Sequence, residues 1–175
     1  MDKVGPITRS VEDCAVVLDA MHGFDGHDPG AVDHPFHWPN RRSLDELRVG
    51  YVKGRTPIDE REDLKVLKKL GVKLVEITLP KTLPVSSIVL MLGVEAGTIF
   101  DDVTRSHITD TLNSWPDTFR LAQFVPAVEY LRASRVRSLL IQEMRKVMDQ
   151  VDLYVGGNDL GLCNLTGHPL SLIHI

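Results

Sequence analysis

The segment from Leu47 to Pro80, "LRVGYVKGRTPIDEREDLKVLKKLGVKLVEITLP", sets the fold class of the chain. Residues 47–52 and 72–80 have the apolar, β-branched composition of strands. Between them, residues 59–71 repeat leucine at helical spacing and end in glycine, as helices commonly do. Strand, helix and strand of these lengths form a βαβ unit, in which the two strands are parallel. The sequence therefore predicts an α/β fold.

Two longer helical patterns and another strand follow this unit. Residues 86–103 are apolar enough for a buried helix. Pro126 suits the first turn of a helix, and apolar residues continue at helical spacing as far as Asp149. Residues 151–157, "VDLYVGG", have strand character and are expected to return to the sheet. Because no internal repeat is visible, we expect one continuous architecture.

The N-terminal segment, "DKVGPITRSVEDCAVVLDAMHG" (residues 2–23), contains a helix with clear boundaries. Ser10 stands at the N-cap, with Asp13 in the capping-box position three residues later. Gly23 is the expected C-terminal cap. The apolar stripe is wider than an exposed helix normally carries, so this helix is predicted to need covering material from elsewhere.

Composition excludes several classes of function. The chain has 175 residues, of which 43% are hydrophobic, which is enough for a core. A net charge of −4 gives no general attraction to nucleic acid, and no apolar run is long enough for a membrane span. The two cysteines show no metal-binding spacing, and no signal peptide is visible. We therefore expect a cytoplasmic protein without a cofactor, membrane association or direct nucleic-acid binding.

Histidines and aspartates crowd the loop that follows the first helix, and they could attract a divalent metal. The residues concerned are His22, Asp25, His27, Asp28, Asp33, His34 and His37. Their spacing fits no familiar ligand set, and polar loops collect such residues for turn formation, so we favour a solvated loop and predict no metal site.

Arg132, Arg135 and Arg137 lie close together on the long helical pattern and could contact a phosphate backbone. In an acidic chain, a solvated helix face is the preferred interpretation.

The pair Ser86-Ser87 could supply a nucleophile and a proton shuttle, but it has no nearby base or glycine-rich oxyanion turn in the sequence. We interpret the pair as an N-cap for the following helix. From the residues alone, no catalytic constellation is identified.

The N-terminal segment resembles the part of amidase signature family enzymes that follows their glycine- and serine-rich catalytic core. The family pattern there is a variant of Leu-Asp-x-x-Gly-Pro-x-x-Arg-(Ser/Thr)-Val-x-Asp, and the matching residues are Asp2, Gly5, Pro6, Arg9, Ser10, Val11 and Asp13. "NLTGHP" (residues 164–169) resembles the family's Asn-x-x-Gly-x-Pro. The similarity spans nearly the whole chain and is greatest to amidases and to the A-type subunit of glutamyl/aspartyl-tRNA amidotransferases.

The resemblance implies amide C–N bond hydrolysis by a Ser–cis-Ser–Lys triad that, in the family, precedes the segment matched by Asp2. It therefore implies that residues 1–175 form an incomplete amidase domain, truncated at both ends, with no catalytic residue of its own. Such a chain is expected to be inactive alone and to complete the sheet and the wall of the substrate pocket. Residues 170–175 are expected to be a non-native tail.

The resemblance also implies a mixed sheet with helices on both faces and a substrate pocket beside it. Gly156, Gly157, Asn158 and Asp159 follow the end of the last strand, where α/β sites usually form, and are the candidate pocket edge. A plain strand-to-loop turn is the favoured alternative. Arg120 is a further candidate for a substrate carboxylate, with a surface ion pair as the equal alternative.

A small-molecule amide substrate and amidotransferase partner subunits are the interactions that the resemblance implies. A self-sufficient, non-catalytic α/β binding or scaffold module remains the alternative function.

Overall fold

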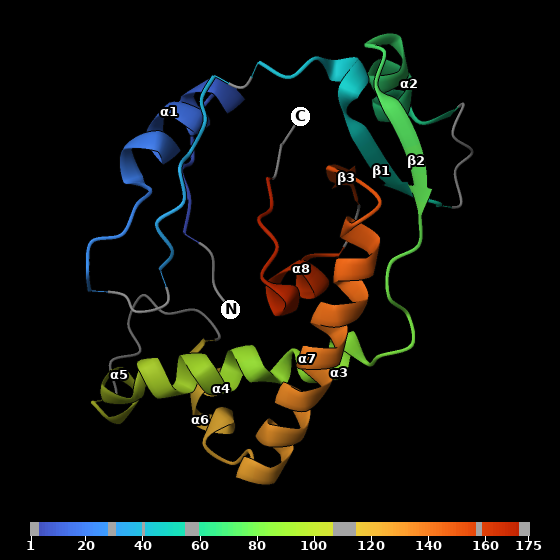
Figure 1. Cartoon of the computed structure of the whole chain (residues 1–175). Helices are drawn as coiled ribbons and strands as arrows, with labels where there is room; N and C mark the ends of the chain where they lie inside the picture. Colours follow the sequence, from blue (N-terminus) through green and yellow to red (C-terminus); the bar gives the residue numbers. More distant parts are fainter. Residues whose placement is uncertain are drawn as a thin grey trace. The chain divides into compact units, whose positions relative to one another are not determined.

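The computed structural model describes residues 4–27, 31–39, 41–54, 60–106, 115–156 and 159–171 (Figure 1). The chain divides into two compact units. One comprises Lys3–Ser43, and the other comprises Leu44–Ile175 together with Met1–Asp2. Over the described ranges, no helix combines the length and the apolarity that a membrane crossing requires.

The smaller unit contains helix α1, Val11–Met21, and its predicted start is confirmed. The backbone N–H of Asp13 donates to the Ser10 hydroxyl oxygen at 3.0 Å, which satisfies one of the amides left open by the first turn. His22 occupies the C-cap, and the predicted Gly23 follows it with a φ of +133°. Apolar side chains of α1 remain exposed, as far as 64% at Val11, while Ala15 is buried.

The larger unit is built on a three-stranded sheet of β1 (Arg48–Val52), β2 (Lys73–Ile77) and β3 (Leu153–Val155). The strand order is β2-β1-β3, and both pairings are parallel. Helix α2, Glu62–Lys69, connects β1 to β2. The predicted βαβ unit and the α/β class are therefore confirmed. Among the described strands, the pairings are parallel and not the mixture expected from the resemblance.

The apolar segment predicted as one helix over residues 86–103 forms three shorter helices. These are α3 (Val85–Ile88), α4 (Leu90–Ile99) and α5 (Asp101–Arg105). A short 3-10 helix, Leu44–Glu46, lies earlier in the unit, before β1. The break between α4 and α5 lies at Phe100, whose ring stacks on that of Phe119 with centroids 5.2 Å apart. Tertiary packing of an aromatic side chain therefore accompanies a break that the sequence pattern does not mark.

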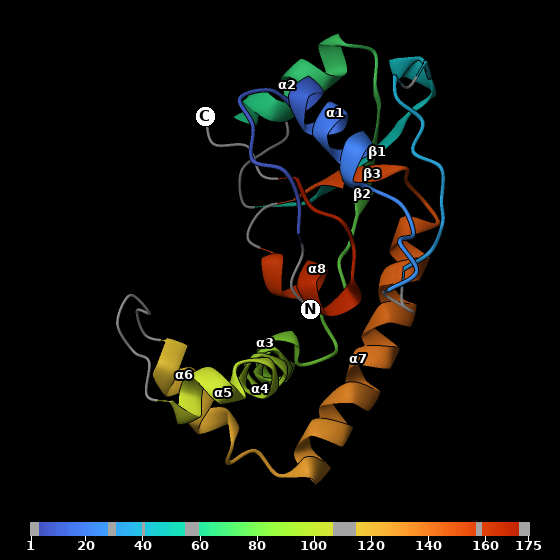
Figure 2. The same ribbon diagram turned by 90° about the vertical axis from the view of Figure 1, so that its left-hand side faces the viewer.

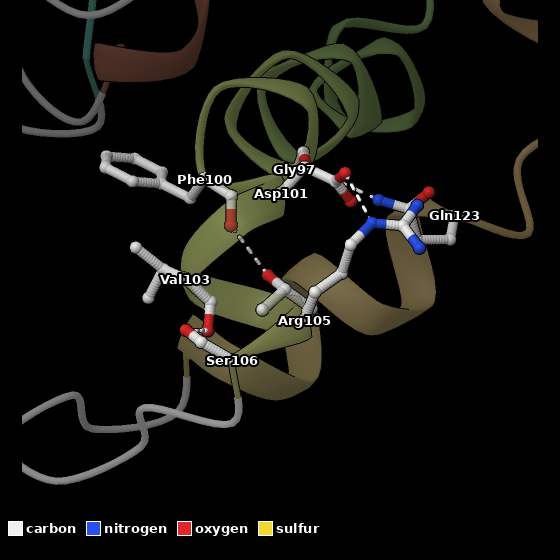
Figure 3. A network of polar contacts seen from close by, with 8 residues as sticks. Gly97, Phe100, Asp101, Val103, Arg105, Ser106 and Gln123 are labelled. Atoms are coloured by element: carbon white, nitrogen blue, oxygen red, sulfur yellow. Dashed lines mark hydrogen bonds and ion pairs between the residues drawn. The ribbon is translucent and has the colours of Figure 1, made fainter.

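Helix α6, Trp115–Ala122, packs closely on α4. A β-carbon added to Gly97 would lie 2.9 Å from the Cβ of Ala122, so glycine permits this approach. Next to the contact, the Gln123 side-chain amide donates to the Gly97 carbonyl at 3.4 Å (Figure 3). Arg105 Nε donates to Asp101 at 2.6 Å in the same network, which fastens the single turn of α5.

Helix α7, Ala127–Met148, is the longest element and begins after Pro126, as predicted. It extends from the neighbourhood of the sheet to the α4–α6 pair (Figure 2). Helix α8, Leu160–Thr166, packs against α7 and α3. The buried core of the unit lies among these helices and the sheet and consists of Ile77, Ile88, Met91, Ala133, Leu140, Met144, Val147, Val151, Leu162 and Leu165.

Candidate functional site

The candidate pocket edge lies between the carboxyl end of β3 and the start of α8. Asp159 is the N-cap residue of α8, and Gly156 is the first residue after β3. A β-carbon on Gly156 would lie 2.6 Å from Asp159 Oδ2 and 2.9 Å from the ring of Tyr154. Glycine therefore gives the Asp159 carboxylate its space. The predicted Gly157 and Asn158 lie outside the described residues.

Asp159 is held by two residues that no sequence motif marks, Tyr154 and Cys163. The Tyr154 hydroxyl lies 2.6 Å from Asp159 Oδ2 and 3.1 Å from Cys163 Sγ. An ionised carboxylate only accepts hydrogen bonds, so the phenol donates to Asp159 and the thiol donates to the phenol oxygen. The three side chains form a directed chain of hydrogen bonds that ends on the carboxylate.

Burial and these partners raise the pKa of Tyr154 above its ordinary value of 10.0. Removal from water is the main cause, and the hydrogen bond to Asp159 follows, because an ionised phenol would lose that bond and face a negative carboxylate. Tyr154 is therefore a neutral donor at physiological pH, and it engages one of the two carboxylate oxygens. Cys163 is 1% exposed, which makes it a structural thiol rather than an accessible nucleophile.

The opposite end of α8 is fixed by α7. Arg137 Nε donates to the Leu165 carbonyl oxygen at 2.6 Å, where the last carbonyls of α8 have no partner within the helix. Gly167 ends the helix with a φ of +78°, in the left-handed region. A cation at a helix C-terminus also complements the helix dipole. Side-chain hydrogen bonds thus hold α8 at both ends, from Tyr154 at its start and from Arg137 at its end.

Only part of the arginine cluster on α7 agrees with the expected solvated face. Arg132 pairs with Glu129 at 2.6 Å on the exposed surface, and Arg135 is exposed. Arg137 is half-buried because it reaches α8. For this residue the expectation of a solvated side chain is wrong, because the sequence gives no sign that α8 returns to this part of α7.

Arg120 is not brought to the β3–α8 junction. It lies on α6 and pairs with Asp117 at 3.0 Å, and its side chain is 44% exposed. Helix α6 packs on α4 and α5, at a distance from β3 and α8 in both views (Figures 1 and 2). The observed contact is the surface ion pair that the sequence left as an alternative, and a role in substrate binding stays a prediction.

Ser86 and Ser87 lie within α3, and their predicted role as an N-cap is wrong. Pro84 occupies the N-cap, and no side chain caps this helix. The two serines line an open groove of about 460 Å³ together with Val89, Leu90, Leu92, Gly93, Trp115 and Thr118. In this set of described residues no side chain can serve as a base, so the groove does not activate either hydroxyl.

The histidine-rich loop does not assemble a metal site from the residues that can be placed. Within the described ranges, no three His, Cys, Asp or Glu side chains come together as ligands. His22 instead accepts the Phe36 N–H at Nε2, at 3.3 Å, and its Nδ1 lies 2.8 Å from the Asp19 carbonyl oxygen. Asp25 accepts the backbone N–H of His27 at 2.8 Å, which is a turn contact. Asp28 lies outside the described residues.

The described residues of the junction supply a carboxylate and a neutral phenol donor, but they do not provide a nucleophile with a base. Asp159 was identified from its place after β3, whereas Tyr154 and Cys163 were not. The available signal was spacing, because Cys163 follows Asp159 by one helical turn and the two residues share a helix face.

Comparison with known proteins identifies the family. The family model described as Amidase matches residues 1–156. The A-type subunit of glutamyl-tRNA(Gln) amidotransferase from Oleidesulfovibrio alaskensis is 29% identical over 194 residues, which cover 89% of this chain and 40% of the relative. An amidase of Pseudomonas putida is 28% identical over 174 residues, which cover 89% of this chain and 36% of the relative. The chain thus spans about 40% of the length of the curated relatives that it matches.

A solved structure shares the fold. It is described as the inhibitor-bound form of a vestigial protein complex that reveals the evolutionary origins of an s-triazine catabolic enzyme. The TM-score is 0.59 at 24% identity, over 84% of this chain and 34% of that one. The likeness supports the observed arrangement of sheet and helices.

Proposed function

The chain belongs to the amidase family, and from that premise we propose that it forms part of an enzyme that cleaves an amide C–N bond, either by hydrolysis or by transfer of the amide nitrogen. The match over residues 1–156 carries the proposal, because it includes the whole parallel sheet. In this proposal the chain completes the sheet and forms a wall of the substrate pocket. The reacting lysine and serines belong to the portion of the family's proteins that precedes the matched segment.

The β3–α8 junction is the proposed pocket wall. Ligands of open α/β sheets bind beyond the carboxyl ends of the strands, and Asp159 stands at that position, half-buried. Its carboxylate suits the N–H groups that amide compounds carry. Gly156 and the predicted Gly157 and Asn158 complete the edge in the proposal.

This chain alone is proposed to lack turnover. Ser86 and Ser87 are adjacent serines, but they lie in a helix beside neutral side chains and have no lysine among the residues that line their groove. Cys163 is buried. The described residues thus supply binding groups and no activated nucleophile.

A small-molecule amide is the proposed substrate of the intact enzyme, with no cofactor. Partner subunits of an amidotransferase are the proposed assembly, because several similar proteins are named as the A-type component of a glutamyl-tRNA(Gln) amidotransferase. The similar amidase of Pseudomonas putida supports a simple hydrolase equally. Amide cleavage is common to both.

A segment replacement tests the proposal. The part of the Pseudomonas putida amidase that matches this chain is replaced by the chain, and ammonia release from that enzyme's amide substrates is measured. We expect turnover from the chimera and none from the isolated chain. The control is the parent amidase without its matching segment, which should be inactive.

Two outcomes contradict the proposal. Ammonia release by the isolated chain would show that it carries its own catalytic groups. A chimera that melts cooperatively, yet releases no ammonia, would favour the alternative of a non-catalytic binding or scaffold module.

A further inference from the structure

We propose that Tyr154 is a positioning residue, whose hydroxyl fixes the orientation of the Asp159 carboxylate at the pocket edge, with Cys163 fixing the hydroxyl in turn. The proposal rests on the proposed function, because it assigns Tyr154 a role in substrate binding through Asp159. Its basis is the 2.6 Å bond from the Tyr154 hydroxyl to Asp159 Oδ2.

The geometry favours one orientation of the Asp159 carboxylate. A free Asp side chain can rotate about two bonds, but here the space left by Gly156 admits the carboxylate, and the Tyr154 ring borders the same space. The hydroxyl proton can reach only one acceptor at a time. The Cys163 thiol, at 3.1 Å, donates to the phenol oxygen and thereby directs the phenol proton toward Asp159.

The direction of the hydrogen bonds from Cys163 through Tyr154 to Asp159 also matters for binding. The Cys163 thiol donates to the Tyr154 hydroxyl, which donates to the carboxylate, so one oxygen of Asp159 is engaged as an acceptor. The second oxygen is then presented in a fixed direction. Loss of the hydroxyl would leave the carboxylate in place but free to turn, which weakens binding more than it slows a chemical step performed elsewhere.

The first test measures the hydrogen bond itself, in the whole chain and without reference to activity. The tyrosine Fermi doublet in ultraviolet resonance Raman spectra distinguishes a phenol that donates a strong hydrogen bond from one that does not. We expect the difference spectrum between the native chain and Tyr154→Phe to show a strong donor. We also expect Asp159→Asn to weaken that signature, because a neutral amide oxygen accepts less strongly.

The second test uses the active chimera with the Pseudomonas putida amidase. Tyr154→Phe is expected to raise KM about 5- to 10-fold, which lies within the net contribution of one ordinary hydrogen bond, with kcat within about twofold. Asp159→Asn should raise KM at least as much. The double variant should bind no worse than Asp159→Asn alone, because Tyr154 acts through Asp159.

Tyr51→Phe is the matched control. Tyr51 lies on β1 opposite Val155 of β3, and its hydroxyl also donates to a carboxylate, Glu76 Oε2 at 3.3 Å. Because Gly50 is the residue that pairs with Tyr154, and successive residues of a strand face opposite sides, the Tyr51 side chain leaves the sheet on the face opposite to that of Tyr154. The same chemical change there should leave KM unaltered.

The outcomes separate this proposal from the proposed function. An unchanged KM in Tyr154→Phe, or effects of the two substitutions that add, would overturn the positioning role. A chimera with no turnover contradicts the proposed function, and the Raman spectra then decide the Tyr154–Asp159 link alone. A weak-donor spectrum for Tyr154 overturns the proposal in either case.

Discussion

Gly50 lies beside Tyr154 at the centre of the sheet, and a β-carbon at position 50 would stand 2.9 Å from the Cβ of Tyr154. The same atom would meet two Ile77 carbons at 3.1 and 3.3 Å. Gly50→Ala should therefore lower the free energy of unfolding by about 1–3 kcal/mol, as overpacking does, in urea denaturation. Gly5→Ala, where the added carbon meets nothing within 4 Å, should change it by less than about 0.5 kcal/mol. Equal effects would show that β1 and β3 are not this close.

Two glycines of α4 provide a matched pair. At Gly97, an added β-carbon would approach Ala122 Cβ to 2.9 Å, so Gly97→Ala should push α6 away and destabilise by about 1–3 kcal/mol. At Gly93 the nearest atom is Thr118 Cγ2 at 3.6 Å, and Gly93→Ala should stabilise by about 0.5–1 kcal/mol through helix propensity. Thermal denaturation of both variants measures the difference, and a Gly97→Ala protein as stable as Gly93→Ala would contradict the α4–α6 contact.

Leu140 and Leu139 are neighbours on α7 with opposite environments. Leu140 is fully buried, whereas Leu139 is 51% exposed. Leu140→Ala should cost about 2–5 kcal/mol, because a cavity remains in the core. Leu139→Ala should cost below about 1 kcal/mol. Guanidinium denaturation of the two variants gives the comparison, and a reversed order would place the wrong face of α7 in the core.

Tyr154 predicts how stability changes in alkaline solution. The pKa of Tyr154 is raised in the folded chain. The folded protein therefore retains the phenol proton at a pH at which the unfolded chain loses it, near the ordinary pKa of 10.0. The stabilisation is complete below that pH, and it declines as the pH rises toward the folded-state pKa. Urea unfolding between about pH 8 and pH 11 should show this decline, and it should be smaller in Tyr154→Phe. Part of the decline should remain in Tyr154→Phe, because burial and Glu76 also raise the pKa of Tyr51. An unchanged slope in Tyr154→Phe would mean that Tyr154 titrates alike in both states.

The local signals in the sequence predicted the strands and their parallel pairing. Capping at Ser10 and the leucine spacing of α2 depend on neighbouring residues, and the structure confirms both elements. The division of residues 86–103 into three helices was not predicted. The second of the two breaks coincides with the stacking of Phe100 on Phe119, which is 19 positions away and which no periodicity reveals.

The candidate site shows the same division between local and distant information. Gly156 and Asp159 were predicted as candidates because both follow the carboxyl end of a strand. Tyr154 was missed because its side-chain direction depends on the sheet, and Arg137 was misjudged because its partner carbonyl lies 28 positions away. The pattern of residues in one sequence does not reveal hydrogen bonds between separate elements.

The position of β1 between its two partners has a consequence for synthesis on the ribosome. β2 becomes available soon after β1, but β3 begins at Leu153, about a hundred positions after Arg48. While the intervening helices are being translated, the edge of β1 that β3 will occupy offers open amide and carbonyl groups to any other extended chain. A nascent polypeptide stalled before Leu153 therefore exposes a strand edge that β3 covers in the folded chain.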